Sequence, residues 1–371
     1  GATLVLPYDA YFNQNVAGFG DFILKSNATI RLGDNFGGQA GSNFPGDYES
    51  TVLDQASTVE YYGTSDQLIY DLPVYGNLTL TNNAVKYLNN FLEIEGNLLI
   101  NPTATFGCDQ PVYMYGPSVT NNGIIEGIFG SSEFSFYGEA AQTYSGTGVW
   151  QGASVGTPFA GLGVNFSNMA GITLNGPLAT ESAYLFNGEI SNSNNMQIGS
   201  ASWSFVQRGG SPSLDAGSFD TYPTIASTGN YTLYYFDAAS NIVTGPEIPA
   251  GINTYRVYCD NANGVSLASD LGVNNDLQLL KDTFDFGPYT VKIANTISLT
   301  AGIADGDEGT LEMTGTSAQT IPNNAFQQNS LKNLVISNTN NVTGVTLADT
   351  LDVYRSVTFG AGGRKLTTGG F

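Results

Sequence analysis

The chain contains no histidine, only two cysteines, and few charged side chains, which make up 12% of its residues. The absence of histidine excludes Ser-His-Asp and Cys-His catalysis, the usual zinc sites and the ordinary acid or base near neutral pH. Two cysteines are too few for a disulfide scaffold, and the separation of 151 positions from Cys108 to Cys259 makes a bridge unexpected. Cys259 falls within a strand pattern, which predicts a small buried apolar residue.

Positive charge is also scarce. The 11 Lys and Arg residues stand against 32 Asp and Glu, which gives a formal net charge of −21. Apart from the adjacent Arg364 and Lys365, the basic residues are scattered singly and form no stripe that could neutralise phosphates, so we expect no binding to nucleic acid or anionic lipid. No apolar run reaches the roughly 18 residues of a membrane-spanning helix, so we expect no direct membrane insertion.

Helix signals are nearly absent, because 46 Gly and 14 Pro interrupt the windows in which a helical period could develop. What remains is a series of short alternating segments, such as residues 78–81, 171–174 and 290–300, bounded by Asn, Gly, Asp or Pro. Alternation directs one side chain inward and the next outward. With 41% hydrophobic residues, including 21 Tyr and 21 Phe, the chain can fill a continuous core. The sequence therefore predicts an all-β protein.

One phrase recurs along the chain. Residues 58–69 read TVEYYGTSDQLI and residues 310–321 read TLEMTGTSAQTI, while residues 132–144 are a looser copy and residues 232–236 begin another. Each copy is followed by short alternating strands around an Asn-rich turn. Self-similarity of this kind indicates like units stacked into an array.

These phrases divide the chain into four modules and a preceding segment. The predicted parts are residues 1–57 as an N-terminal cap or the end of a preceding module, 58–131 as module 1, 132–231 as module 2 with long insertions, 232–309 as module 3, and 310–371 as a truncated module 4.

Two architectures compete. One is a parallel β-helix, or β-solenoid, of about 16 to 18 coils with roughly 20 residues each, and the other is a row of tandem β-sandwich domains. The strands are short, and the modules have no recognisable linkers between them. Asn recurs at corresponding turns, where it tolerates left-handed backbone and can stack in hydrogen-bonded ladders. These features favour the β-helix.

The densest acidic group comprises Asp305, Asp307 and Glu308, separated and followed by glycines. Oxygen ligands at alternating positions form a candidate calcium site, and calcium is the only cofactor that the sequence suggests. The group lacks the complete spacing of a calcium loop, so an acidic solvated turn is the alternative interpretation.

Enzymatic activity is not expected. Polygalacturonase-like β-helix enzymes carry an Asn-Thr-Asp segment, an Asp-Asp pair and a Gly-His-Gly, and this chain has none of them. Trp150 and Trp203 lie in or beside the two long insertions, where exposed rings could stack on sugars. Alternating aromatic positions on strands more commonly fill a core, and this second interpretation stays open.

The C-terminal part resembles a known family. The phrase GTSAQTI at 315–321, LKNLVISN at 331–338 and GVTLADTLDV at 344–353 are similar to repeats of very large bacterial surface proteins exported by the type IX secretion pathway, including mobile adhesins of gliding bacteria. The likeness is clearest over 310–371 and good over 58–106. It implies an extracellular, cell-surface filament of which this chain is one piece, with O-glycosylation at a site such as Thr350.

We therefore expect a non-catalytic structural and adhesive shaft segment. Its expected partners are surface glycans or other cell-surface proteins. Two alternatives remain: a polysaccharide-binding or polysaccharide-degrading β-helix protein, and a surface-lattice protein assembled with calcium.

Overall fold

The computed structural model describes most of the chain. The described residues are 1–7, 20–33, 44–45, 48–71, 73–127, 130–152, 157–161, 163–200, 203–226, 230–361 and 364–368. Half of the residues are in strands and 1% are helical, and the parallel sheets wind as a β-solenoid, or parallel β-helix, of about 15 turns. The predicted β-helix is confirmed. Tandem β-sandwiches would need antiparallel pairing, whereas every strand pair between described residues is parallel.

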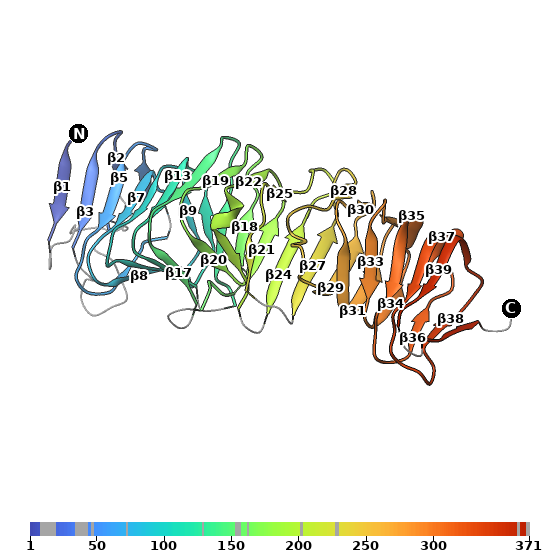
Figure 1. Cartoon of the computed structure of the whole chain (residues 1–371). Coiled ribbons are helices and arrows are strands. Elements are labelled where there is room, and N and C mark those ends of the chain that lie inside the picture. The colour runs from blue at the N-terminus through green and yellow to red at the C-terminus, as the bar shows by residue number, and fades with distance from the viewer. Residues whose placement is uncertain are drawn as a thin grey trace. The chain divides into compact units, whose positions relative to one another are not determined.

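The chain forms two compact units. Unit 1 comprises Gly1–Ala183 and Gly188–Ser200, and unit 2 comprises Tyr184–Asn187 and Ala201–Phe371. Within each unit the strands follow one another as a ladder of coils (Figure 1). The division of the sequence into modules starting at 58, 132, 232 and 310 stays a prediction about its repeats.

Three parallel sheets form the faces of the coils in unit 1. One face contains β1 (Thr3–Leu6), β3 (Thr29–Leu32), β5 (Thr58–Tyr61), β7 (Asn77–Leu80), β10 (Leu98–Ile100), β13 (Ser118–Asn121), β16 (Gln142–Ser145), β19 (Ile172–Leu174) and β22 (Glu189–Ser191). A second contains β6 (Gln67–Leu68), β8 (Val85–Tyr87), β11 (Thr105–Gly107), β14 (Ile124–Glu126) and β17 (Val149–Gln151). The third contains β9 (Leu92–Ile94), β12 (Val112–Met114), β15 (Glu133–Phe136) and β18 (Gly163–Phe166).

The remaining elements of unit 1 are shorter ladders and one turn of 3₁₀-helix. They are β2 (Asp21–Leu24) with β4 (Ser50–Leu53), β20 (Leu178–Thr180) with β23 (Met196–Ile198), and η2 (Ser193–Asn195). A further strand, β21 (Ser182–Leu185), contributes residues to both units.

Unit 2 contains both short and long strands. They are β24 (Ser204–Arg208), β25 (Ser218–Phe219), β26 (Thr224–Ile225), β27 (Tyr231–Phe236), β28 (Ile242–Val243), β29 (Thr254–Asp260), β30 (Val265–Ser266), β31 (Leu271–Leu279), β32 (Thr283–Asp285), β33 (Thr290–Ile293), β34 (Thr296–Leu299), β35 (Ile303–Met313), β36 (Gln319–Ile321), β37 (Phe326–Ile336), β38 (Val345–Leu347), β39 (Asp352–Phe359) and β40 (Leu366–Thr368). The long strand β31 pairs with β33 at its start and with β34 at its end, so it continues from one face to the next.

Coil length varies more than the sequence predicts. Thr58 pairs with Asn77, 19 positions later, whereas Gln142 pairs with Ile172, 30 positions later. The longer coils carry loops between their strands. For this reason the chain winds about 15 turns instead of the predicted 16 to 18.

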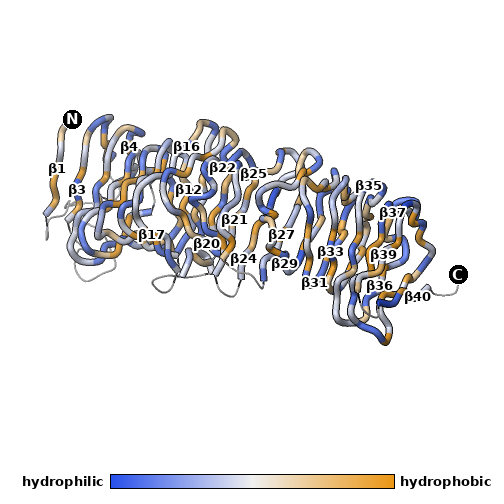
Figure 2. Tube along the Cα trace, in the orientation of Figure 1, coloured by the Kyte–Doolittle hydropathy of each residue, from blue (hydrophilic) through white to orange (hydrophobic). Residues whose placement is uncertain are grey.

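Alternation along the strands builds the core. In β7 and β10, Leu78, Leu80, Leu98 and Ile100 are fully buried, while the residues between them face outward. Hydrophobic and hydrophilic positions follow one another along the coils (Figure 2). Each such apolar side chain contributes roughly 1.5 to 3 kcal/mol when it leaves water.

The recurring sequence phrase forms a coil corner. Gln67, Gln142 and Gln319 occupy the same place in three copies, and all three are buried. Each side-chain amide donates a hydrogen bond of 2.9 to 3.1 Å to a carbonyl of the preceding coil, that of Leu32, Met114 and Ile293 respectively. In two copies the glutamine oxygen also accepts the N–H of the glycine four positions earlier, Gly63 or Gly315. The phrase therefore encodes packing between coils.

Asparagines act at corners in both predicted ways. Asn82 has a φ of 66°, in the left-handed region that Asn tolerates. On an exposed edge, the Asn97 amide donates to Asn77 Oδ1 at 2.9 Å, and Ser118 donates to Asn97 Oδ1 at 2.6 Å, forming a ladder of consecutive coils. The two cysteines, Cys108 and Cys259, are buried and unpaired as expected.

Candidate functional site

The predicted calcium ligands lie along a strand. Asp305, Asp307 and Glu308 belong to β35, and Asp305 Oδ1 accepts the N–H of Asp307 at 3.1 Å. Asp305 and Asp307 alternate with the buried Gly306, so both carboxylates lie outside the coil, and the adjacent Glu308 is exposed as well. Among the residues that the structure describes, no group of three His, Cys, Asp or Glu side chains is placed to hold a metal ion. The three predicted ligands are therefore neighbours on β35 that do not form such a group, and calcium binding there stays a prediction.

Trp150 is a core residue, with 2% of its surface exposed. Its ring lies 5.1 Å from Phe134 and 5.5 Å from Phe159, both edge-to-face, and its indole N–H donates to the Tyr144 hydroxyl at 2.8 Å. The ring thus has no face open to a sugar. This corrects the expectation that Trp150 contacts glycan: it fills the core of unit 1.

Thr350 lies on an exposed turn before β39. Its N–H donates to the Asp349 carboxylate at 2.7 Å, and its own side chain is exposed. The hydroxyl donates a long hydrogen bond of 3.5 Å to the same carboxylate, and O-glycosylation of this exposed residue stays a prediction.

Trp203 lies on a surface of aromatic rings in unit 2. It precedes β24, is 39% exposed, and stacks on Phe205 with ring centroids 5.6 Å apart and planes 13° apart. Tyr184 lies 5.5 Å from Phe205 and 5.9 Å from Phe186. We call Tyr184, Phe186, Trp203 and Phe205 the aromatic row. Strand alternation places the side chains of the row outside the coil while their neighbours enter the core.

Outward rings continue on the next strands of the same sheet. Tyr234 lies 5.2 Å from Phe236 on β27 and 5.4 Å from Tyr258 on β29, and Tyr234 and Tyr258 are paired in register. The intervening Tyr235 is buried in the core. The sequence cluster at 231–236 therefore divides between the core and the surface.

Charges border these rings. The Tyr234 hydroxyl donates to Asp260 at 2.8 Å, and Lys281 Nζ lies 2.9 Å from Asp237 and 3.1 Å from Asp260. Partial burial together with the hydrogen bond to Asp260 raises the pKa of Tyr234, so its hydroxyl stays protonated near neutral pH. Lys281 also lies 5.5 Å from the Phe236 ring. Its positive charge is matched by two carboxylates, which leaves it little attraction for an anionic ligand.

Unit 1 carries a smaller surface of the same kind. Tyr115 stacks on Tyr137 at 5.7 Å and 22°, and Tyr113 lies 5.7 Å from Tyr137 and 6.2 Å from Phe91. Phe91 and Tyr115 are 44% and 45% exposed, so these rings present accessible faces. Burial and then the charge of Glu133 raise the pKa of Tyr113.

Such surfaces fit a particular ligand chemistry. Aromatic faces attract apolar C–H groups, and sugar rings expose C–H faces between their hydroxyls. Nucleic-acid bases also stack on rings, but a chain of net charge −21 repels their phosphates. The arrangement is thus suited to uncharged carbohydrate.

Comparison of the chain with models of protein families, with curated proteins and with solved structures gives no match. In the described part of the chain, no helix is long and apolar enough to cross a membrane.

Proposed function

We propose that this chain is a non-catalytic shaft segment of a large secreted cell-surface filament, and that its outward aromatic rings adhere to neutral surface glycans. The observation that carries the proposal is the aromatic row of unit 2, in which the ring of Trp203, 39% exposed, stacks on the half-buried Phe205 at the start of β24. Isolated exposed apolar residues are ordinary on protein surfaces, whereas a contiguous group of outward-facing rings is typical of a binding surface.

The coils supply the mechanical part of this function. Parallel pairing between successive coils, such as β29 with β31 and β35 with β37, places backbone hydrogen bonds along the direction of stacking. Tension applied along that direction within a unit is shared by all the bonds of a coil. Buried corner amides such as Gln319 add side-chain hydrogen bonds between coils.

The acidic surface supports the choice of a neutral ligand. The excess of 32 acidic over 11 basic residues repels uronic acid and sulfated polymers and reduces lateral association of like chains. The resemblance to type IX-exported adhesin repeats adds the extracellular location and the membership in a longer chain. In the proposed setting, the partners are glycans on a surface, and other cell-surface proteins could share the same rings.

Affinity electrophoresis tests the adhesive part. The chain is run through gels containing hydroxyethyl cellulose, galactomannan or polygalacturonate. We expect retardation by at least one neutral polymer and none by polygalacturonate. Trp203→Ala should weaken retention about tenfold, which corresponds to about 1.4 kcal/mol.

The control is Tyr354→Ala, which removes a ring of similar exposure, 55%, elsewhere in unit 2. Equal retention of the wild-type chain and the Trp203→Ala variant would contradict the adhesive role of the row. Release of new reducing ends from the retained polymer would contradict the non-catalytic part of the proposal.

A further inference from the structure

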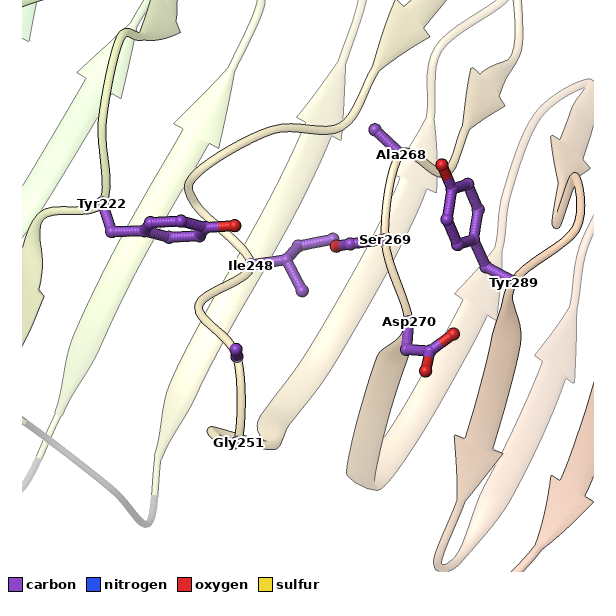
Figure 3. A pocket seen from close by; sticks show the side chains of 8 residues that line it. Tyr222, Ile248, Gly251, Ala268, Ser269, Asp270 and Tyr289 are labelled. Carbon is purple, nitrogen blue, oxygen red and sulfur yellow. The ribbon is translucent and has the colours of Figure 1, made fainter.

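Unit 2 contains a groove of about 420 Å³, and no residue of the aromatic row lines it. The Tyr222 and Tyr289 rings stand at its two sides, with Ile248 between them and Ser269 and Asp270 along one edge (Figure 3). These residues come from separate coils and turns. The volume falls within the range of about 300 to 1,000 Å³ of small-molecule sites.

The polar groups of the groove have few partners in the protein. Among the described residues, the hydroxyls of Tyr222, Ser269 and Tyr289 make no hydrogen bond. One oxygen of Asp270 accepts the N–H of Thr290 at 2.8 Å, which fixes the carboxylate and leaves its second oxygen without a partner in the described chain. The groove thus offers two rings, three hydroxyls and one oriented carboxylate.

A buried ion pair fixes one wall of the groove. Arg208 Nη1 lies 2.8 Å from Glu247 Oε1, and the side chains of the two residues are 7% and 0% exposed. Glu247 directly precedes Ile248. Its Oε1 also accepts the Gly245 N–H at 2.9 Å, and its carbonyl accepts the Tyr231 hydroxyl at 2.7 Å.

These bonds hold the turn 245–251 from inside the coil. Ion pairs buried in this way cost desolvation energy and are weak as general stabilisers. The Arg208–Glu247 pair nevertheless has a structural role, because it positions the turn that carries Ile248 beside the groove. A wall held in place before binding also lowers the ordering cost that a ligand must meet.

We propose that this groove binds one or two pyranose rings of a neutral glycan. Tyr222 and Tyr289 stack on C–H faces of the sugar, the Ser269 hydroxyl donates to or accepts from its hydroxyls, and the Asp270 carboxylate accepts hydrogen bonds from them. The carboxylate disfavours uronic acids, and no Lys or Arg lines the groove to attract an anion. The inference rests on the proposed glycan adhesion and adds a second contact of defined chemistry, in an open groove.

Isothermal titration calorimetry of the full chain tests the groove with three neutral probes and one acidic probe. The neutral probes are the hexasaccharides of β-1,4-glucan, β-1,3-glucan and β-1,4-mannan, and the acidic probe is hexagalacturonate. We expect at least one neutral probe to bind, and to bind at least tenfold more tightly than hexagalacturonate. Tyr222→Ala and Tyr289→Ala should each weaken that binding about tenfold, and Asp270→Asn should weaken it less.

The matched control is again Tyr354→Ala, which should leave hexasaccharide affinity unchanged. Circular dichroism establishes that each variant keeps the wild-type β-sheet content. Failure of all three neutral hexasaccharides to bind, or equal affinity in the Tyr222→Ala, Tyr289→Ala and wild-type chains, would overturn the assignment.

The two glycan proposals fail separately. If polymer retention depends on Trp203 but no hexasaccharide binds, the groove is not a sugar site and the proposed adhesion stands. If hexasaccharide binding depends on Tyr222 and Tyr289 while Trp203→Ala keeps full polymer retention, the groove stands and the aromatic row is not the adhesive surface.

Discussion

Removal of the Glu247 carboxylate should loosen unit 2 around the groove. In Glu247→Ala, Arg208 Nη1, the Tyr235 hydroxyl and the Gly245 N–H lose an acceptor that lies 2.8, 3.2 and 2.9 Å away. Arg208 keeps its bonds to the carbonyls of Gly217 and Val243, at 2.8 and 2.7 Å, but its charge stays buried without a counter-charge. Breaking such a pair costs about 3 to 5 kcal/mol. We place this variant in the upper part of that range because two further donors are left unpaired.

The pKa of Arg208 also indicates that its interaction with Glu247 is strong. Burial by itself lowers the pKa of Arg208, but the charge and hydrogen bond of Glu247 outweigh burial and raise it. A double variant, Arg208→Met with Glu247→Leu, removes both charges and should therefore cost less than Glu247→Ala alone. Replacement of a buried pair by apolar residues of similar volume is often close to neutral.

Hydrogen exchange measured by mass spectrometry can resolve this effect by region. In Glu247→Ala, the free energy of opening measured from peptides covering residues 204–260 should fall by about 3 to 5 kcal/mol. Peptides covering residues 77–126 of unit 1 serve as an internal control. The reasoning is refuted if protection over 204–260 changes by less than about 1 kcal/mol. It is also refuted if the double variant loses as much protection as the single one.

Two other predictions concern coil corners and pH. Gly315→Ala should destabilise unit 2 by about 1 to 3 kcal/mol in urea unfolding, because an added Cβ would overlap the Ala294 carbonyl oxygen. The control is Gly130→Ala, which should change the free energy of unfolding little because an added Cβ there meets open space. Burial lowers the pKa of Lys86 from 10.5 to about 8, so the unfolded chain binds more protons between these values. Stability of unit 1 should therefore rise from pH 8 to 9.5 by at most about 1.4 kcal/mol per pH unit, and a slope that persists in Lys86→Met would contradict this origin.

Much of the fold could be predicted because its signals are local. Strand alternation and Asn-rich turns indicated coils, and the repeated glutamine phrase proved to mark a corner in which Gln67 and Gln319 make equivalent bonds. The number of turns was overestimated, because loop residues within a coil are not distinguishable in sequence from residues of a further short strand.

The site residues were harder to predict. Trp150 and Trp203 both lie near loops, and a loop resets the phase of alternation, so sequence alone did not decide which ring enters the core. The groove joins Tyr222, Asp270 and Tyr289 from separate coils, and no spacing in the sequence marks them as neighbours. The length of each coil decides which residues of successive coils become neighbours, and coil length was the feature hardest to predict from the sequence.

Single-molecule force spectroscopy gives the most direct test of a shaft that adheres through its surface. The tip is coated with a neutral polymer that retards the chain in gels, or with galactomannan if no polymer retards it. It is brought to immobilised wild-type or Trp203→Ala chains, and rupture and unfolding events are recorded separately. We predict that Trp203→Ala loses most rupture events, while the forces that unfold the coils stay unchanged. Rupture events that persist in Trp203→Ala would contradict adhesion through the aromatic row. Unfolding forces that fall in this variant would contradict coils whose mechanical strength is independent of the adhesive surface.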